Sequence, residues 1–244
     1  MKLKKIFRTA WEGLMLNKVR SFLTTLGVII GVASVIVMLA VSAGAEASIA
    51  EQINALGANL IIVSPMRGIP GAGPTLLIDD AYAIAEQVVG VTGNSAEQSP
   101  AAQNIRAGGV TLESIPVIGT TADFSSVRDY AVAEGRYFTA DEDDRKAKVV
   151  ILGSGIATDL FGTESAIGQT ITVDSTKLTV IGVMETKGLV ADVDYDGRVY
   201  LPINLVFQKF MTASPMGTDA VRTIYLKSES QEQIDSIIAQ TTAI

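Results

Sequence analysis

The longest apolar run of the chain, Phe22 to Ala45, contains no charged residue over 24 consecutive positions. An α-helix rises about 1.5 Å per residue and a bilayer core is about 30 Å thick, so about 20 apolar residues are enough to span it. A cleavable signal peptide is the alternative, because small residues around Ala43 and Ala45 resemble a cleavage site. The apolar region of a signal peptide, however, usually has only about 7 to 15 residues. The run therefore predicts an uncleaved transmembrane helix over residues 21–45.

The helical pattern continues beyond this run. Ile49, Ile53 and Leu56 recur at spacings of three to four residues, and Gly57 is a typical C-terminal stop. We therefore expect a stalk over residues 46–56 that extends the transmembrane helix. A rigid stalk would couple the two sides of the membrane.

After the stalk, short apolar runs alternate with helical patterns. The run at 60–63 predicts a strand, followed by a Gly/Pro-rich loop at 67–74 and a helix over 80–89 that Asp79 caps. Short helices are expected at 139–144, 154–161 and 203–210, and Ser230 with Gln233 resembles a capping box before a last helix. Further strands are expected at 101–107, 110–119, 148–152, 170–174, 177–185, 197–201 and 221–226, with hairpin turns at 108–109 and 174–175.

The order of these elements predicts the fold class. A strand and a helix near the start, and another strand and helix at the end, enclose a β-rich middle, which favours an α+β domain over one regular parallel sheet. We expect the segments 46–112 and 204–244 to form an α+β core. Residues 113–203 are expected to form a separate, β-rich inserted subdomain, farther from the membrane than the core.

Charge is distributed unevenly about the apolar run. The first 20 residues carry a net charge of +5, whereas the remainder carries −12. Lys and Arg are retained on the cytoplasmic side of a membrane, so we expect the amino terminus inside and the domain outside. The acidic outer part gives no support to nucleic-acid binding, which needs a basic patch. The basic residues that predict this topology are Lys2, Lys4, Lys5, Arg8, Lys18 and Arg20.

Two further patterns concern the membrane segment. Apolar residues recur at helical spacing within 1–20, with Trp11 beside them. This predicts an amphipathic helix in the inner membrane interface, where its basic residues meet anionic lipid headgroups; a flexible basic tail is the alternative. Gly27 and Gly31 are four residues apart and allow another helix to approach closely. Their partner helix would come from another chain or from sequence outside these 244 residues.

The composition excludes most site chemistry. With no His and no Cys, the chain has no disulfides, no Ser-His-Asp triad, no Cys-His pair and no zinc site of the usual kind. It also has no Gly-Lys dipeptide and therefore no Walker A loop for nucleotide phosphates. We expect no catalytic residue, no metal site and no cofactor, so any ATP must be hydrolysed elsewhere.

Two short motifs resemble ligand sites but lack a required residue. Gly153 and Gly155 follow an apolar strand as in a dinucleotide-binding turn, yet Thr158 stands where the third glycine belongs. The stretch DVDYDG, residues 192–197, matches the first half of a calcium-binding loop, yet Ile203 replaces the bidentate Glu. We interpret the glycines as a tight strand-to-helix turn and the acidic stretch as a surface hairpin.

Several longer motifs together resemble a known family. In their order they are similar to the amino-terminal half of MacB-type, FtsX-like ABC transporter permeases, and the resemblance runs from about Asn17 to Ile203. It implies a first transmembrane helix and an extracytoplasmic core that contains a βαβ subdomain and a β-rich inserted one. The motifs are NKVRSFLTTLGVIIGVASVIVML, LGANLIIVSP, GTTADFSSVRDYAVAEGRYFTADE, VVILGSGIATDLFG, AIGQTITV, LTVIGVMETKG and GRVYLPI.

The resemblance implies a non-enzymatic subunit in the cytoplasmic membrane that works with a cytoplasmic ABC ATPase. The ATPase cycle would move the membrane helices and, through the stalk, the outer domains, a mode of action called mechanotransmission. The resemblance also implies a homodimer or a paired permease, a periplasmic adaptor protein, and macrolides, peptides or lipoproteins as cargo. Family members carry three further membrane helices after the core, so we expect this sequence to be a fragment.

A single-span sensor or cell-wall regulatory protein is the competing interpretation. Its outer domain would bind a partner and would need no ATPase. A membrane-anchored enzyme is a third class, whose catalytic groups would have to be carboxylates such as those at 141–144; we expect this cluster to open a solvated helix instead. Sequence beyond Ile244 separates the first two, because three apolar runs would favour the permease.

Overall fold

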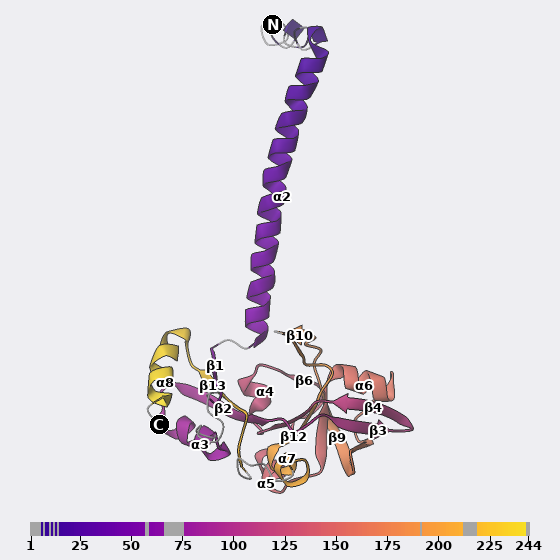
Figure 1. Ribbon diagram of the computed structural model, residues 1–244, viewed down its shortest axis with the longest axis vertical. Helices are drawn as coiled ribbons and strands as arrows, with labels where there is room; N and C mark the ends of the chain where they lie inside the picture. Colours follow the sequence, from indigo (N-terminus) through magenta and orange to yellow (C-terminus); the bar gives the residue numbers. More distant parts are fainter. Residues whose placement is uncertain are drawn as a thin grey trace. The chain divides into compact units, whose positions relative to one another are not determined.

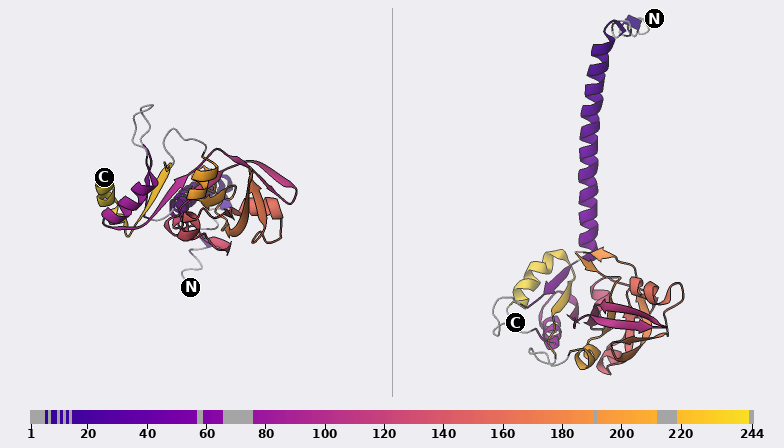
Figure 2. Two further views of the ribbon diagram at one scale, coloured as in Figure 1. Left: turned by 90° about the horizontal axis from the view of Figure 1, so that it is seen from below. Right: turned by 45° about the vertical axis from the view of Figure 1, so that its right-hand side comes forward.

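The computed structural model describes residues 6, 8, 9, 11, 13, 15–56, 59–65, 76–190, 192–211 and 219–242. The chain divides into two compact units, residues 1–51 and 52–244. Figures 1 and 2 show the ribbon, coloured along the sequence.

The first unit is dominated by α2 (Lys18–Leu56), a continuous helix of 39 residues whose last turns belong to the second unit (Figure 1). The predicted membrane span and the predicted stalk are therefore parts of one helix. At about 1.5 Å per residue α2 is about 58 Å long, nearly twice the thickness of a bilayer core. The hydroxyl groups of Thr24, Thr25 and Ser34 donate to the carbonyl oxygens four residues earlier, so these polar groups need no water inside a membrane.

The second unit contains a mixed sheet of 11 strands. Among the neighbouring pairs, β12 with β5 and β9 with β7 are parallel, and the others are antiparallel. In sheet order the strands are β1 (Leu60–Val63), β13 (Thr223–Ser228), β2 (Val91–Gln98), β5 (Val117–Thr120), β12 (Val199–Pro202), β7 (Val149–Leu152), β9 (Thr176–Met184), β8 (Thr170–Val173), β3 (Gln103–Ala107) and β4 (Val110–Ile115), with β6 (Val132–Gly135) also paired to β9. A separate small sheet joins β10 (Leu189–Val190) to β11 (Val193–Asp194).

Helices and apolar side chains divide the sheet into regions. At one end, α3 (Ile78–Gln87) and α8 (Ile234–Thr241) pack on β1, β13 and β2 around buried Ile84, Ile224 and Ile237 (Figure 1). At the other, α6 (Ser154–Phe161) and α7 (Ile203–Lys209) pack with β7, β8 and β9. An aromatic cluster forms a third core. The remaining helices are α4 (Phe124–Val127), α5 (Ala140–Asp144) and the 3₁₀ turn η1 (Gln231–Gln233).

The predicted α+β class is confirmed, and most predicted elements are present within one or two residues of the expected bounds. The helix at 154–161, the strand at 60–63 and both hairpin turns are confirmed. The predicted strand 110–119 is in fact two strands, because Pro116 separates β4 from β5. The predicted loop at 67–74 and the stop at Gly57 lie outside the described residues.

Both predicted helix caps are wrong. The N-cap of α3 is Leu77, and Asp80 rather than Asp79 accepts a hydrogen bond from the Leu77 N–H at 2.7 Å. Ser230 precedes η1 without a capping bond from its side chain. In its place the Ser228 hydroxyl donates to the Ser230 carbonyl oxygen at 2.7 Å, so the serine two residues earlier organises this turn.

The expectation that core and insertion form separate sheets is wrong. One sheet runs from β1 through β5 and β9 to β4, since β5 pairs with both β2 and β12. The residues of β3, expected in the core, pair with β8, and Leu205 and Val206 of α7 pack with the apolar cluster of β7 to β9. The division into two structural units, the segments 46–112 with 204–244 and the insertion 113–203, stays a prediction.

Candidate functional site

The outward surface of α2 is the first functional feature. Within the described residues, 18–46 form the one helix that is long and apolar enough to cross a membrane, and no side chain in its most apolar window is buried. Lys18 and Arg20 lie in its first turn. Arg8 and Trp11 are helical and exposed, whereas Lys2, Lys4 and Lys5 lie outside the described residues. The orientation across the membrane stays a prediction.

Gly27 and Gly31 lie in the middle of this apolar stretch. Among the described residues, nothing comes within 4 Å of the position that a Cβ atom would take at either glycine. Their shared face of α2 is therefore open to close approach by another helix, which is the property that the sequence predicted. Their role in helix packing stays a prediction.

Three cations converge on the aromatic cluster of the second unit. Arg128 is only 3% exposed, and its Nη2 donates to the Tyr195 hydroxyl. Its guanidinium carbon lies 4.5 Å from the ring centre of Tyr225. The Lys187 Nζ lies 5.0 Å from the ring centre of Tyr130, and the Arg198 guanidinium carbon lies 4.8 Å from that of Tyr195.

These cations stabilise the packing of a loop. Burial, and then the nearby Arg128 charge, lower the pKa of Lys187 to about 8. Attraction to ring faces partly replaces the hydration that buried cations lose. Lys187 and Tyr195 flank the segment that carries β10 and β11, while Arg128 follows α4, so the contacts hold this segment against the sheet. Sequence reasoning did not find the cluster, because its members are far apart along the chain.

The two motifs that resemble ligand sites pack against each other. A Cβ atom at Gly153 would lie 2.4 Å from the Asp196 carbonyl oxygen, and one at Gly155 would lie 3.0 Å from it. The Gly153 N–H donates to the Arg198 carbonyl oxygen at 2.9 Å, and the Ile156 N–H to that of Asp196 at 3.2 Å. The N–H groups that would face a phosphate in a dinucleotide site therefore bind the chain itself, and the interpretation of the glycines as a tight turn is supported.

The acidic stretch at 192–197 organises its own backbone. The Asp194 carboxylate accepts from the N–H groups of Asp196 and Gly197, at 3.0 and 3.1 Å. The Asp196 carboxylate accepts from those of Lys187 and Gly188, at 2.9 and 3.0 Å. These carboxylates thus fix the turn that fits against Gly153.

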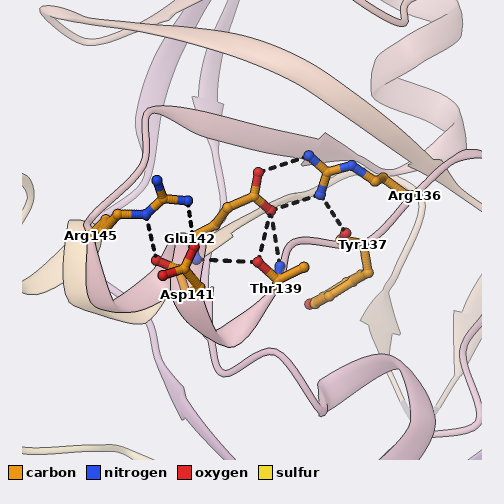
Figure 3. A network of polar contacts seen from close by, with 6 residues as sticks. All are labelled: Arg136, Tyr137, Thr139, Asp141, Glu142 and Arg145. Atoms are coloured by element: carbon orange, nitrogen blue, oxygen red, sulfur yellow. Dashed lines mark hydrogen bonds and ion pairs between the residues drawn. The ribbon is translucent and has the colours of Figure 1, made fainter.

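The carboxylates at 141–144 differ from one another in their surroundings. Glu142 accepts two hydrogen bonds of 2.7 Å from the Arg136 guanidinium and one of 3.0 Å from the Thr139 N–H at the start of α5 (Figure 3). The Arg136 hydrogen bonds hold the pKa of Glu142 down to about 2. Asp143 is only 4% exposed and accepts from the Asn204 N–H of α7 at 3.0 Å.

The carboxylates at 141–144 lie in a helix, as expected, but the burial of Asp143 contradicts the expectation that this helix is solvated. Burial raises the pKa of Asp143 to about 6, and its contact with Asn204 ties α5 to α7. The Asp143 carboxylate therefore has a structural role, because it connects α5 with α7. In the described part of the chain, no three His, Cys, Asp or Glu side chains are grouped to hold a metal ion.

Comparison with known sequences gives consistent matches. The sequence profile of the MacB-like periplasmic core domain matches residues 21–244. The macrolide export ATP-binding/permease protein MacB of Wolinella succinogenes is 31% identical, over 98% of this chain and 38% of its own length. MacB of an Azoarcus species is 37% identical, over 94% and 34%. The pyoverdine export ATP-binding/permease protein PvdT of Pseudomonas aeruginosa is 34% identical, over 85% and 31%. The chain thus spans about a third of the length of these curated relatives.

Solved structures share the fold. The periplasmic region of MacB from Actinobacillus actinomycetemcomitans has a TM-score of 0.61 at 21% identity, covering 78% of this chain and 83% of that one. The extracellular domain of the noncanonic ABC-type transporter YknZ from Gram-positive bacteria has a TM-score of 0.59 at 22% identity, covering 73% and 88%. At such identities the likeness concerns the fold of the domain.

Proposed function

This chain belongs to the family of MacB-like periplasmic core domains, and we propose on that premise that it is the amino-terminal part of an ABC-type export permease. One observation carries the proposal: the family match covers residues 21–244, a range that includes both the apolar helix and the domain. The curated relatives are ABC-type export permeases, and the domain fits a subunit of such a transporter. The match favours the permease over the single-span sensor.

The proposed mechanism is mechanotransmission. A cytoplasmic ABC ATPase would move the membrane helices, and α2 would carry this movement to the domain outside the membrane. The continuity of α2 from Lys18 to Leu56 supports this role, since a helix transmits force along its axis better than a flexible linker does. The domain's first strand, β1, begins at Leu60, only four positions after the last residue of α2, so little slack separates helix from sheet.

The partners follow from the same proposal. We place the chain in the cytoplasmic membrane, with its basic amino terminus inside and residues 52–244 outside. A second permease copy or a paired permease would face Gly27 and Gly31, anionic lipids would contact the basic residues, and a periplasmic adaptor would bind the domain. Because relatives are named for macrolide and for pyoverdine export, the cargo class is a matter for measurement.

A kink in α2 tests the proposal in the complete permease with its ATPase. Proline inside a helix removes a hydrogen bond and costs about 3 kcal/mol or more, so Ala50→Pro should abolish most export while ATP hydrolysis persists. Ala50→Gln, which keeps the helix, is the control. Export of a macrolide and of pyoverdine is measured beside ATP hydrolysis. Export by Ala50→Pro equal to that of the control would refute mechanotransmission through α2.

A further inference from the structure

The sheet has an open edge at β1. In the described residues no strand lies on the side of β1 opposite to β13. The Ser228 N–H donates to the Asn59 carbonyl oxygen at 2.8 Å, and the paired residues that follow are Leu60 with Lys227 and Ile61 with Leu226. Hydrogen-bonded and non-hydrogen-bonded pairs alternate along antiparallel strands, so the backbone groups of Leu60 and Ile62 point to the open edge.

The topology indicates what lies at this edge. The unit β1-α3-β2 crosses over β13, which runs antiparallel to both strands. α8 follows β13 and packs in the same apolar cluster as α3, on the same face of the sheet. Crossovers between parallel strands are right-handed in about 98% of cases.

The strand β13 runs antiparallel to β1, and α8 covers the same face of the sheet as α3. A right-handed crossover from β13 through α8 therefore leads across the sheet in the direction opposite to that of the crossover from β1 through α3 to β2. It therefore passes β1 and reaches the open edge. The four strands would then form the split βαβ arrangement of a β-α-β-β-α-β unit, in which three strands are present and the fourth position is open.

A groove marks the fourth position. β1 lines it with Ile61, Ile62 and Val63, and the last turn of α8 lines it with Ile238 and Thr241. Its volume is about 320 Å³. Ile62 is 54% exposed and Ile238 is 46% exposed, although both lie beside a buried core. A strand at this edge would cover Ile238 with side chains on its helix-facing side. It would cover Ile62, which points to the opposite face from Ile61, with side chains on its other side, and it would satisfy the backbone groups of β1.

We propose that this edge is the docking site of a strand formed by the segment that follows Ile244 in the full-length polypeptide, antiparallel to β1. The inference rests on the proposed function in one respect, namely that the chain is part of a longer permease. An antiparallel strand ends beside the start of β1, which directly follows α2. The polypeptide would thus enter and leave the domain on adjacent strands, and any movement of the two attached membrane segments would act on one pair of strands.

Hydrogen exchange of single amides provides the test, with this chain compared with the longer permease polypeptide. We expect the Leu60 and Ile62 amides to exchange at least about tenfold more slowly in the longer polypeptide, because they gain strand hydrogen bonds. Unchanged exchange at both amides would overturn the proposal. Protection that arises in residues 1–244 alone as their concentration increases would assign the edge to a second copy, and would also overturn it.

Proline substitution gives a second, independent measurement. Ile62→Pro removes an N–H that faces the open edge, so it should leave the melting temperature of this chain almost unchanged and lower that of the domain in the longer polypeptide. Ile61→Pro is the matched control, because its N–H faces β13 and its loss should destabilise both. An equally small effect of Ile62→Pro in both would contradict the proposal. Neither measurement depends on export, so a failed strand assignment remains distinguishable from a failed export function.

Discussion

Single carboxylates in this domain show how neighbouring groups fix the role of a residue. Glu142 and Asp143 are adjacent, yet the Arg136 hydrogen bonds lower the pKa of the first to about 2 and burial raises that of the second to about 6. Glu142 closes a capping box with Thr139 and binds Arg136, which comes before α5 in the chain (Figure 3). Asp143 turns inward to the Asn204 N–H. Position in the sequence alone would treat the two as equivalent.

Glu142→Gln should destabilise the domain in a pH-dependent way. The substitution removes a charged partner of Arg136 and weakens a helix cap, which together cost about 1–2 kcal/mol when allowance is made for the exposure of Arg136. Because the folded-state pKa of Glu142 is lowered to about 2, this stabilisation is fully present above about pH 4.5 and is lost as the pH falls toward 2. Denaturant unfolding of wild type and variant at pH 7 and pH 3 measures it. A difference that grows at pH 3 would contradict the assignment.

At the scale of elements, α2 is a single helix that serves two environments. Its first half is apolar and exposed, as suits contact with lipid, and its second half continues with Glu46 and Glu51. The helix bonds of its backbone are internal throughout, which is a requirement within a bilayer. Among the described residues, nothing lies within 4 Å of a Cβ atom placed at Gly27 or Gly31. A requirement for small residues at these two positions would therefore come from another helix.

Gly27→Leu combined with Gly31→Leu should therefore weaken assembly and leave the domain intact. Bulky side chains would keep a partner helix at a distance and weaken its association with α2, whereas melting of residues 52–244 should not change. Gly44→Leu is the control, since that glycine also has open space around it and lies about 100° around the helix from Gly27. Copurification of tagged and untagged permease copies from membranes measures association. Equal losses for both variants would rule out a specific glycine face.

At the scale of the whole molecule, charge asymmetry accompanies the division into units. The basic amino-terminal stretch and the acidic remainder, +5 and −12, lie on opposite sides of the apolar run. The positive charges rather than the acidic ones govern orientation in a membrane.

Reversing the charges in Lys18→Glu with Arg20→Glu should thus reduce the fraction of molecules with the domain outside. The chain has no Cys, so Ser175→Cys in the exposed turn between β8 and β9 provides a unique label site. In spheroplasts, a membrane-impermeant maleimide should label this cysteine in the otherwise unchanged chain and label less of the charge-reversed variant. Labelling of the unchanged chain only after lysis would show that the predicted orientation is wrong.

The sequence alone determined the elements whose signals are local. The apolar run indicated the candidate membrane-spanning part of α2. Gly108 with Gly109 indicated a hairpin, because these two adjacent residues adopt positive φ angles of 53° and 93° that glycine favours. The predicted α6 and β1 have the bounds of the structure, since each follows from consecutive residues. The glycines at 153 and 155 were also interpreted as a turn from local pattern.

Only the tertiary structure decided features that depend on distant partners. β2 was not predicted, because its sequence VTGNSAEQ is polar, yet Ser95 bonds Thr121 at 2.8 Å and Gln98 bonds the Ala220 carbonyl at 2.8 Å, so the strand is stable inside the sheet. The joining of the two predicted units into one sheet depends on β5 and β12, whose paired positions are 82 residues apart, as in Val117 with Val199 and Gly119 with Leu201. No local pattern encodes such a pairing.

Hydrophobic periodicity reports which face of an element is buried, and it carries no information about which other element buries it. Long-range packing therefore determines the neighbours of β5, the burial of polar residues in β2 and the open edge of β1. The partner of each strand depends on the other strands of the sheet.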